Sequence, residues 1–291
     1  MASLRGSWAR ASLAIAAAGL VVTGVAAIAL AVSVARRVVT PPTVREEDVR
    51  ILAVDERAGT VTLAPTPETV VPGRYGMWFS RDAGYLRVVH GTLGGATRGR
   101  WSGWYYLRPD ELGLPFTEVS VPTDLGPAPA WCFPGAAAEG PVAGDSRWVI
   151  QMHGRGVTRS EALRAVPVFH ELGFTSLLIS YRNDGEAPAS DDGRYSLGDA
   201  EWRDLEAAVR FAREQRAQRI LVMGWSMGGA STLQFVTRSE LSSAVEGIIL
   251  ESPVVDWIRV LHAQAAQQGL PDPVRSVALG VLGSEWASGW A

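Results

Sequence analysis

The sequence predicts an α/β fold with a parallel β-sheet and flanking helices, preceded by a small β-rich region and an N-terminal transmembrane helix. Near-continuous apolar runs are typical of strands that are buried on both faces of a sheet, and they occupy residues 148–152, 175–181, 219–223 and 245–250. Between two of these runs, residues 199–215 carry apolar side chains at helical spacing, which predicts a crossover helix capped by Ser196 or Asp199. With a further helix expected at about 229–239, the pattern is βαβαβ with right-handed crossovers.

The most informative stretch is the G-x-S-x-G sequence Gly224-Trp225-Ser226-Met227-Gly228, which follows one of the apolar runs. It predicts a strand that ends in a sharp turn and lifts the hydroxyl of Ser226 clear of the backbone, ahead of a helix. Glycine suits the flanking positions because such a turn brings backbone too close for a Cβ atom. The alternative interpretation is a strand-to-helix turn that is glycine-rich by chance and has no catalytic role.

A second motif strengthens the first. The apolar run 148–152 leads into His153-Gly154-Arg155-Gly156, an H-G-x-G turn. A turn of this kind can direct a backbone N–H, here that of Arg155, at a developing oxyanion.

Residues from about 116 to 260 resemble the α/β-hydrolase fold, nearest to its serine aminopeptidase-like and esterase-like branches. The motifs that carry the resemblance are H-G-R-G, S-Y-R-N-D-G, G-W-S-M-G-G and E-S-P-V-V-D-W. The resemblance implies Ser226 as nucleophile and the N–H groups of Met227 and Arg155 as an oxyanion hole. It also implies that residues 116–133 form the antiparallel hairpin that opens such domains.

The sequence departs from this family in its last part. No strand followed by an aspartate or a histidine is recognisable beyond Trp257, so the C-terminal part of the fold is expected to be missing. The chain has four histidines. By elimination His262 is a possible base, because His153 belongs to the oxyanion turn and His90 and His170 lie elsewhere. Asp256 is a possible acid, with a bond to its own loop backbone as the alternative.

Two classes of function therefore stay open at this point. One is a membrane-anchored serine hydrolase that cleaves an ester, thioester or amide through a Ser226 acyl-enzyme, acting on a small-molecule or peptide substrate. The other is a non-catalytic or truncated hydrolase-like binding module. The single cysteine, Cys132, offers no cysteine-based metal site, and no metal or cofactor is expected. The formal net charge of −3 gives no reason to expect nucleic acid as a partner.

The N-terminal region predicts a membrane anchor. After a short tail at 1–10, residues 11–35 are uncharged and long enough to cross a bilayer of roughly 30 Å. A cleavable signal peptide is the competing interpretation. We expect a single-pass anchor with the main domain outside the cytoplasm. The remaining organisation is then a small β-rich domain at 45–112, in which alternating residues predict short strands, followed by a hydrolase-like domain at 116–291.

Overall fold

The computed structural model describes residues 25–42, 47–55, 57–73, 75–81, 84–87, 97–136 and 146–283. The chain divides into two compact units. The larger unit comprises residues 41–190 and 197–253, and the smaller unit comprises residues 1–40, 191–196 and 254–291. The helices that follow residue 254 therefore group with the N-terminal helix rather than with the sheet that precedes them in sequence.

The first sheet of the larger unit is antiparallel and has the strand order β2-β1-β5-β3-β4. Its strands are β1 (Val49–Asp55), β2 (Thr60–Leu63), β3 (Gly76–Arg81), β4 (Gly84–Arg87) and β5 (Arg98–Ser102). Strand β5 ends at Ser102, where the chain turns. The Ser102 hydroxyl accepts a hydrogen bond from the Trp104 N–H at 3.2 Å. The Trp104 carbonyl then packs so closely on Gly76 that a Cβ there would lie 2.4 Å from it.

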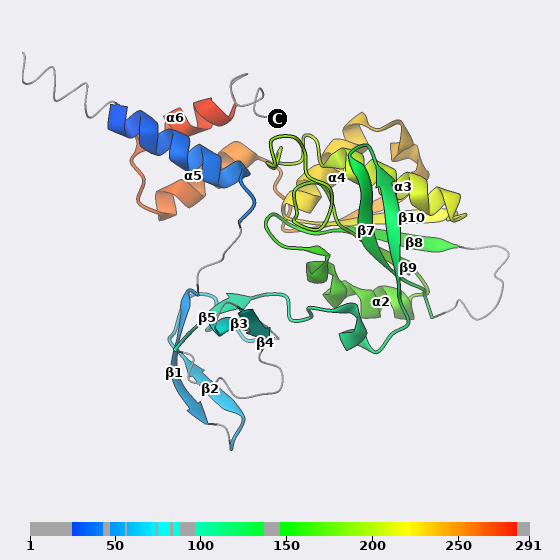
Figure 1. Ribbon diagram of the computed structural model, residues 1–291, viewed down its shortest axis with the longest axis horizontal. Helices are drawn as coiled ribbons and strands as arrows, with labels where there is room; N and C mark the ends of the chain where they lie inside the picture. The colour runs from blue at the N-terminus through cyan, green and yellow to red at the C-terminus, as the bar shows by residue number, and fades with distance from the viewer. Residues whose placement is uncertain are drawn as a thin grey trace, which may run out of the picture. The chain divides into compact units, whose positions relative to one another are not determined.

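The second sheet has the order β11-β10-β8-β9-β7-β6 and holds the predicted α/β core (Figure 1). Its strands are β6 (Thr117–Thr123), β7 (Gly126–Phe133), β8 (Arg147–Met152), β9 (Thr175–Ile179), β10 (Arg219–Trp225) and β11 (Val245–Glu251). Strands β9, β8, β10 and β11 are parallel, whereas β6 and β7 form the predicted antiparallel hairpin and make the sheet mixed. The central strands β8 and β10 are almost wholly buried, as their apolar sequences predict.

Helices cover both faces of this sheet, with α2 on one side and α3 and α4 on the other (Figure 1). Their bounds are η1 (Pro109–Leu112), η2 (Arg159–Ala165), α2 (Val166–Glu171), α3 (Trp202–Glu214), α4 (Met227–Arg238) and η3 (Glu240–Ala244). In α3 the buried side chains Leu205, Ala208, Val209 and Ala212 form the predicted apolar stripe. The predicted cap of α3 is wrong: Glu201 is the N-cap residue, and its buried carboxylate instead accepts a hydrogen bond from the Gly198 N–H at 2.7 Å.

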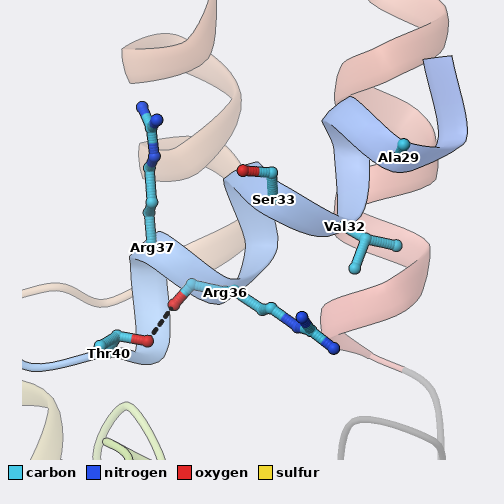
Figure 2. A pocket seen from close by; sticks show the side chains of 6 residues that line it. All are labelled: Ala29, Val32, Ser33, Arg36, Arg37 and Thr40. Carbon is cyan, nitrogen blue, oxygen red and sulfur yellow. Dashed lines mark hydrogen bonds between the residues drawn. The ribbon is translucent and has the colours of Figure 1, made fainter. Parts of the chain in front are cut away.

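The smaller unit consists of a helix at 25–39 together with α5 (Trp257–Gln267) and α6 (Asp272–Leu282). Ala31 and Ala35 of the first helix are buried against Val274 and Ala278 of α6, because small side chains let two helices approach closely. The end of the first helix is held by a hydrogen bond from the Thr40 hydroxyl to the Arg36 carbonyl, beside a surface pocket of about 530 Å³ (Figure 2).

None of the helices in the described parts of the chain is long and apolar enough to cross a membrane. Residues 11–24 of the predicted anchor lie outside the described residues.

Candidate active site

Ser226 lies on the sharp turn between β10 and α4, as the G-x-S-x-G motif predicts. Its backbone dihedral angles are φ 49° and ψ −112°, a region that residues with a side chain rarely adopt. Two hydrogen bonds hold the residue in this conformation: its N–H donates to the Glu251 carbonyl at 3.1 Å, and its carbonyl accepts from the Ala230 N–H at 3.2 Å. Although Ser226 is the N-cap residue of α4, its side chain makes no capping hydrogen bond. The hydroxyl is therefore not used to terminate the helix.

The glycines on either side make this turn possible. A Cβ atom on Gly224 would lie 2.6 Å from the Gly228 carbonyl oxygen. A Cβ atom on Gly228 would lie 2.2 Å from the Met152 oxygen and 2.5 Å from the His153 oxygen. All of these obstacles are backbone atoms, so no side-chain movement could relieve them. The start of α4 is thus packed directly on the end of β8, which brings Ser226 to the His153–Gly156 turn.

The Gly154 peptide lies next to the serine and is held from several sides. A Cβ atom on Gly154 would lie 3.3 Å from the Ser226 Cβ. The Gly154 carbonyl accepts hydrogen bonds from the Tyr181 hydroxyl at 2.8 Å and from Nδ1 of His153 at 2.9 Å. The Gly154 N–H donates to Oε2 of Glu161 at 2.7 Å. Arg155 follows immediately, at the position where the motif predicts the second oxyanion donor.

Met227 supplies the other predicted donor. It is the first residue of α4, so its N–H has no carbonyl partner one turn back within the helix. The positive end of the helix dipole adds to the attraction of this position for negative charge. The two predicted donors therefore belong to the two turns that meet beside Ser226.

His153 has a structural role in this turn. Its side chain is fully buried, it stacks on Tyr181 at 4.2 Å between ring centroids, and its Nε2 lies 3.1 Å from Oδ2 of Asp184. Its two ring nitrogens thus lie within hydrogen-bond distance of two oxygen atoms, one on the Gly154 carbonyl and one on the Asp184 carboxylate. Burial acts to raise the pKa of Asp184, but His153 and the backbone N–H groups of Glu186 and Ala187 outweigh it and lower that pKa.

A polar cluster borders the turn at the ends of β10 and β11. The Trp225 indole N–H donates to Glu251 at 2.8 Å, and Arg164 donates to the other oxygen of the same carboxylate at 3.0 Å. Arg164 also donates to the Gly103 carbonyl at 3.1 Å. Sequence reasoning missed Glu161, Tyr181, Asp184 and Glu251. For Tyr181 and Asp184 the S-Y-R-N-D-G motif was the available signal, whereas Glu161 had none.

The predicted acid and base both belong to the smaller unit. Asp256 is the N-cap residue of α5, where its carboxylate accepts a hydrogen bond from the Arg259 N–H at 3.0 Å, so the alternative of a bond to its own backbone is the one observed. His262 lies on α5 in the smaller unit and lines a pocket of about 70 Å³ there with residues of the first helix and α6. His170 bonds the Pro134 carbonyl at 2.7 Å, and His90 lies outside the described residues.

Ser226 and the His153–Gly156 turn thus meet at the start of α4. The two described histidines of the larger unit, His153 and His170, form hydrogen bonds with other groups. The described residues also contain no group of three or more histidine, cysteine, aspartate or glutamate side chains that could hold a metal ion.

Family models match two parts of the chain. Residues 163–273 match the model described as the Prolyl oligopeptidase family, a stretch that includes β9, β10, β11 and the Ser226 turn. Residues 50–89, in the first sheet, match the model described as Domain of unknown function (DUF8805). No curated protein matches the chain.

The chain is also similar to solved structures of hydrolases. An esterase from Pyrococcus furiosus is 20% identical, with a TM-score of 0.46, over 59% of this chain and 63% of its own. A puromycin-hydrolyzing peptidase from Mycobacterium tuberculosis is 18% identical, with a TM-score of 0.45, over 62% of this chain and 28% of its own. Dienelactone hydrolase from Anabaena variabilis is 17% identical, with a TM-score of 0.37, over 48% of this chain and 64% of its own. The chain thus spans less than two thirds of the length of each of these three proteins.

Proposed function

We propose that the chain is a serine hydrolase of the α/β-hydrolase type that cleaves an ester, thioester or amide through an acyl-enzyme on Ser226, a proposal that the match of residues 163–273 to the Prolyl oligopeptidase family model supports. The hydroxyl oxygen attacks the substrate carbonyl carbon, and the oxygen of that carbonyl takes up negative charge. The N–H groups of Met227 and Arg155 stabilise this charge. The leaving group departs to give the acyl-enzyme, which water then hydrolyses to release the acid.

The observation that carries the proposal is the conformation of Ser226. Its strained backbone angles are maintained by the two hydrogen bonds of its own N–H and carbonyl, while its hydroxyl caps nothing. Backbone strain of this kind costs on the order of 1–3 kcal/mol and persists where the surrounding packing imposes it. A turn that served packing alone would be less strained with glycine in this place.

The proposal needs a general base to take the serine proton. In the larger unit, His153 and His170 are engaged in hydrogen bonds with their own surroundings. His262 is therefore the candidate base among the described residues. We propose a small molecule or a peptide as the substrate.

The competing function is a non-catalytic binding module. The engagement of both described histidines of the larger unit favours it, because loss of one member of a catalytic triad typically costs about four orders of magnitude or more in rate. The retained oxyanion turn and the uncommitted serine hydroxyl favour the hydrolase.

Labelling with a fluorophosphonate probe tests the proposal. We expect the wild-type chain to label and to hydrolyse an activated p-nitrophenyl ester, and Ser226→Ala to lose both properties. Ser243→Ala, which removes an exposed serine in η3, is the matched control and should behave as wild type. His262→Ala should reduce labelling as strongly as Ser226→Ala if His262 is the base. Wild-type labelling no faster than that of Ser226→Ala would contradict the hydrolase and support the binding module.

We also propose that residues 11–35 anchor the chain in a membrane as a single pass, with the main domain outside the cytoplasm. The support is the length and lack of charge of this segment. After carbonate extraction of membranes from expressing cells, the chain should stay in the pellet, and protease added outside spheroplasts should digest the domain. Recovery in the soluble fraction, or a mature N-terminus near Arg36, would contradict the anchor.

A further inference from the structure

Glu161 is a carboxylate at the candidate active site that no sequence motif identified. It lies on η2 and accepts a hydrogen bond from the Gly154 N–H at 2.7 Å. A Cβ atom on Gly154 would lie 3.2 Å from Oε2 of Glu161 and 3.3 Å from the Ser226 Cβ. The carboxylate and the serine therefore flank the same small glycine.

The short helix that carries Glu161 is fixed at several points. Its buried Arg159 forms ion pairs with Glu118 at 2.9 Å and with Glu186 at 3.1 Å. The Ser160 hydroxyl donates to the Leu107 carbonyl at 2.9 Å. At the other end of η2, Arg164 pairs with Glu251 at 3.0 Å. The position of the Glu161 backbone is thus defined independently of its bond to Gly154.

The bond from Glu161 completes the restraint of the Gly154 residue. Tyr181 and His153 hold its carbonyl, which lies in the same planar peptide as the N–H of Arg155. Glu161 holds its N–H, which lies in the preceding peptide. The two peptides meet at the Cα atom of Gly154, so the bond from Glu161 limits rotation about that atom and thereby movement of the peptide that carries the Arg155 N–H. A hydrogen bond to an ionised acceptor is worth roughly 1.5–3 kcal/mol, about twice a neutral one, which is enough to select one orientation of a glycine turn.

We propose that Glu161 is a positioning residue that sets the orientation of the oxyanion donor at Arg155, an inference that rests on the hydrolase function proposed above. Its effect is geometric and acts through the backbone. Its negative charge is unfavourable for an oxyanion nearby, because like charges repel. The carboxylate therefore does not stabilise the oxyanion directly. The residue promotes the reaction by fixing the donor, and an uncharged acceptor of the same shape can replace it.

This predicts different results for two substitutions. Glu161→Ala removes the acceptor and should lower kcat for an activated ester by about 10-fold or more with little change in KM, because a misplaced oxyanion donor costs up to about 100-fold. Glu161→Gln keeps an acceptor oxygen and should recover most of the lost rate, to within about threefold of wild type. Glu171→Ala, an exposed glutamate at the end of α2, is the matched control. Equal losses in the Ala and Gln variants would overturn the proposal.

Hydrogen exchange of the Gly154 N–H provides a readout that does not depend on activity. The Gly154 N–H should exchange slowly in the wild type and almost as slowly in Glu161→Gln. In Glu161→Ala its exchange rate should rise by about 10-fold. Unfolding midpoints check that the wild type and both variants are folded. Unchanged protection in Glu161→Ala would overturn the proposal. If the wild type shows no Ser226-dependent reaction, the hydrolase function fails, and the exchange result still shows whether Glu161 holds the turn.

Discussion

The turn that carries Ser226 and the helix α5 differ in how tightly their surroundings define them. Around Ser226, β8 and β10 are buried, two glycines are in backbone contact with neighbouring segments, and polar groups bond to one another. In α5 no residue is buried, and the carboxylate of Asp256 bonds to the backbone of its own helix. The positions of Ser226 and of the His153–Gly156 turn are therefore set by the packing of the central strands, whereas no buried contact within α5 fixes Asp256 or His262.

The largest difference between the larger and the smaller unit should come from glycine substitutions. Gly228→Ala places a Cβ against backbone oxygens of Met152 and His153, so we expect it to lower the free energy of unfolding by about 3 kcal/mol or more. Gly280→Ala in α6 meets no atom within 4 Å and should raise it by up to about 1 kcal/mol, because alanine favours a helix. Urea unfolding followed by tryptophan fluorescence measures both. A similar decrease in the free energy of unfolding in both variants would contradict the expected difference.

The second largest difference should be between a buried and an exposed ion pair, in the free energy of unfolding that each contributes. Arg182 and Asp204 pair at 2.7 Å with side chains that are 7% and 2% exposed, so Arg182→Ala leaves a buried charge unpaired and should cost about 3–5 kcal/mol. The pKa of Asp204 is raised, chiefly by burial, in spite of this pairing. On α5, Arg259 is 88% exposed, and Arg259→Ala should cost less than about 1 kcal/mol. Unfolding midpoints in urea measure both losses of stability. Equal losses in Arg182→Ala and Arg259→Ala would contradict the expected difference.

The Asp184 carboxylate should make stability depend on pH. Its pKa is lowered in the folded chain, so its contribution is present above the unfolded value of 3.8 and is lost as pH falls through the folded value. We expect wild type to exceed Asp184→Asn in unfolding midpoint by a constant amount from pH 7 to about 5, and the difference to shrink below about pH 4. A difference that stayed constant down to pH 2 would contradict a lowered pKa for Asp184.

The smallest effects are expected at Asp256. Asparagine caps a helix as well as aspartate does, so Asp256→Asn should leave stability unchanged, whereas Asp256→Ala should cost about 1 kcal/mol. If capping is the role of this carboxylate, Asp256→Asn should also label with a fluorophosphonate at the wild-type rate. A labelling rate that fell in Asp256→Asn without a fall in stability would instead identify Asp256 as the catalytic acid.

The parts of the molecule that the sequence predicted are those set by contacts near in the chain. The strand, turn and helix around Ser226 follow from an apolar run and closely spaced glycines, because each residue limits its immediate neighbours. The hairpin of β6 and β7 was expected from the resemblance to the α/β-hydrolase fold and is present. The alternative interpretation of Asp256 as a bond to its own backbone was also available, because a helix cap involves residues three positions apart.

The parts that could not be predicted depend on how separate elements meet. In the sequence, Glu161 does not differ from any polar residue on the surface of a helix. Its bond to Gly154 forms because η2 folds back over the end of β8. The pairing of His153 with Asp184 joins residues on neighbouring strand ends. Glu201, not Ser196 or Asp199, is the N-cap residue of α3, and its buried carboxylate bonds the Gly198 N–H rather than the N–H groups of the helix. None of these contacts has a local pattern in the sequence.

The most direct test of the account is to locate the covalent adduct formed by a fluorophosphonate. Trypsin cleaves after Arg219 and Arg238 and releases Ser226 in the peptide 220–238, which is suited to tandem mass spectrometry. After prolonged incubation of the native chain, the account predicts the added mass on Ser226 and on no other residue of that peptide, and no adduct after heat denaturation. An adduct on a different serine, or an unmodified Ser226 at saturating probe, would contradict the central claim that Ser226 is the nucleophile.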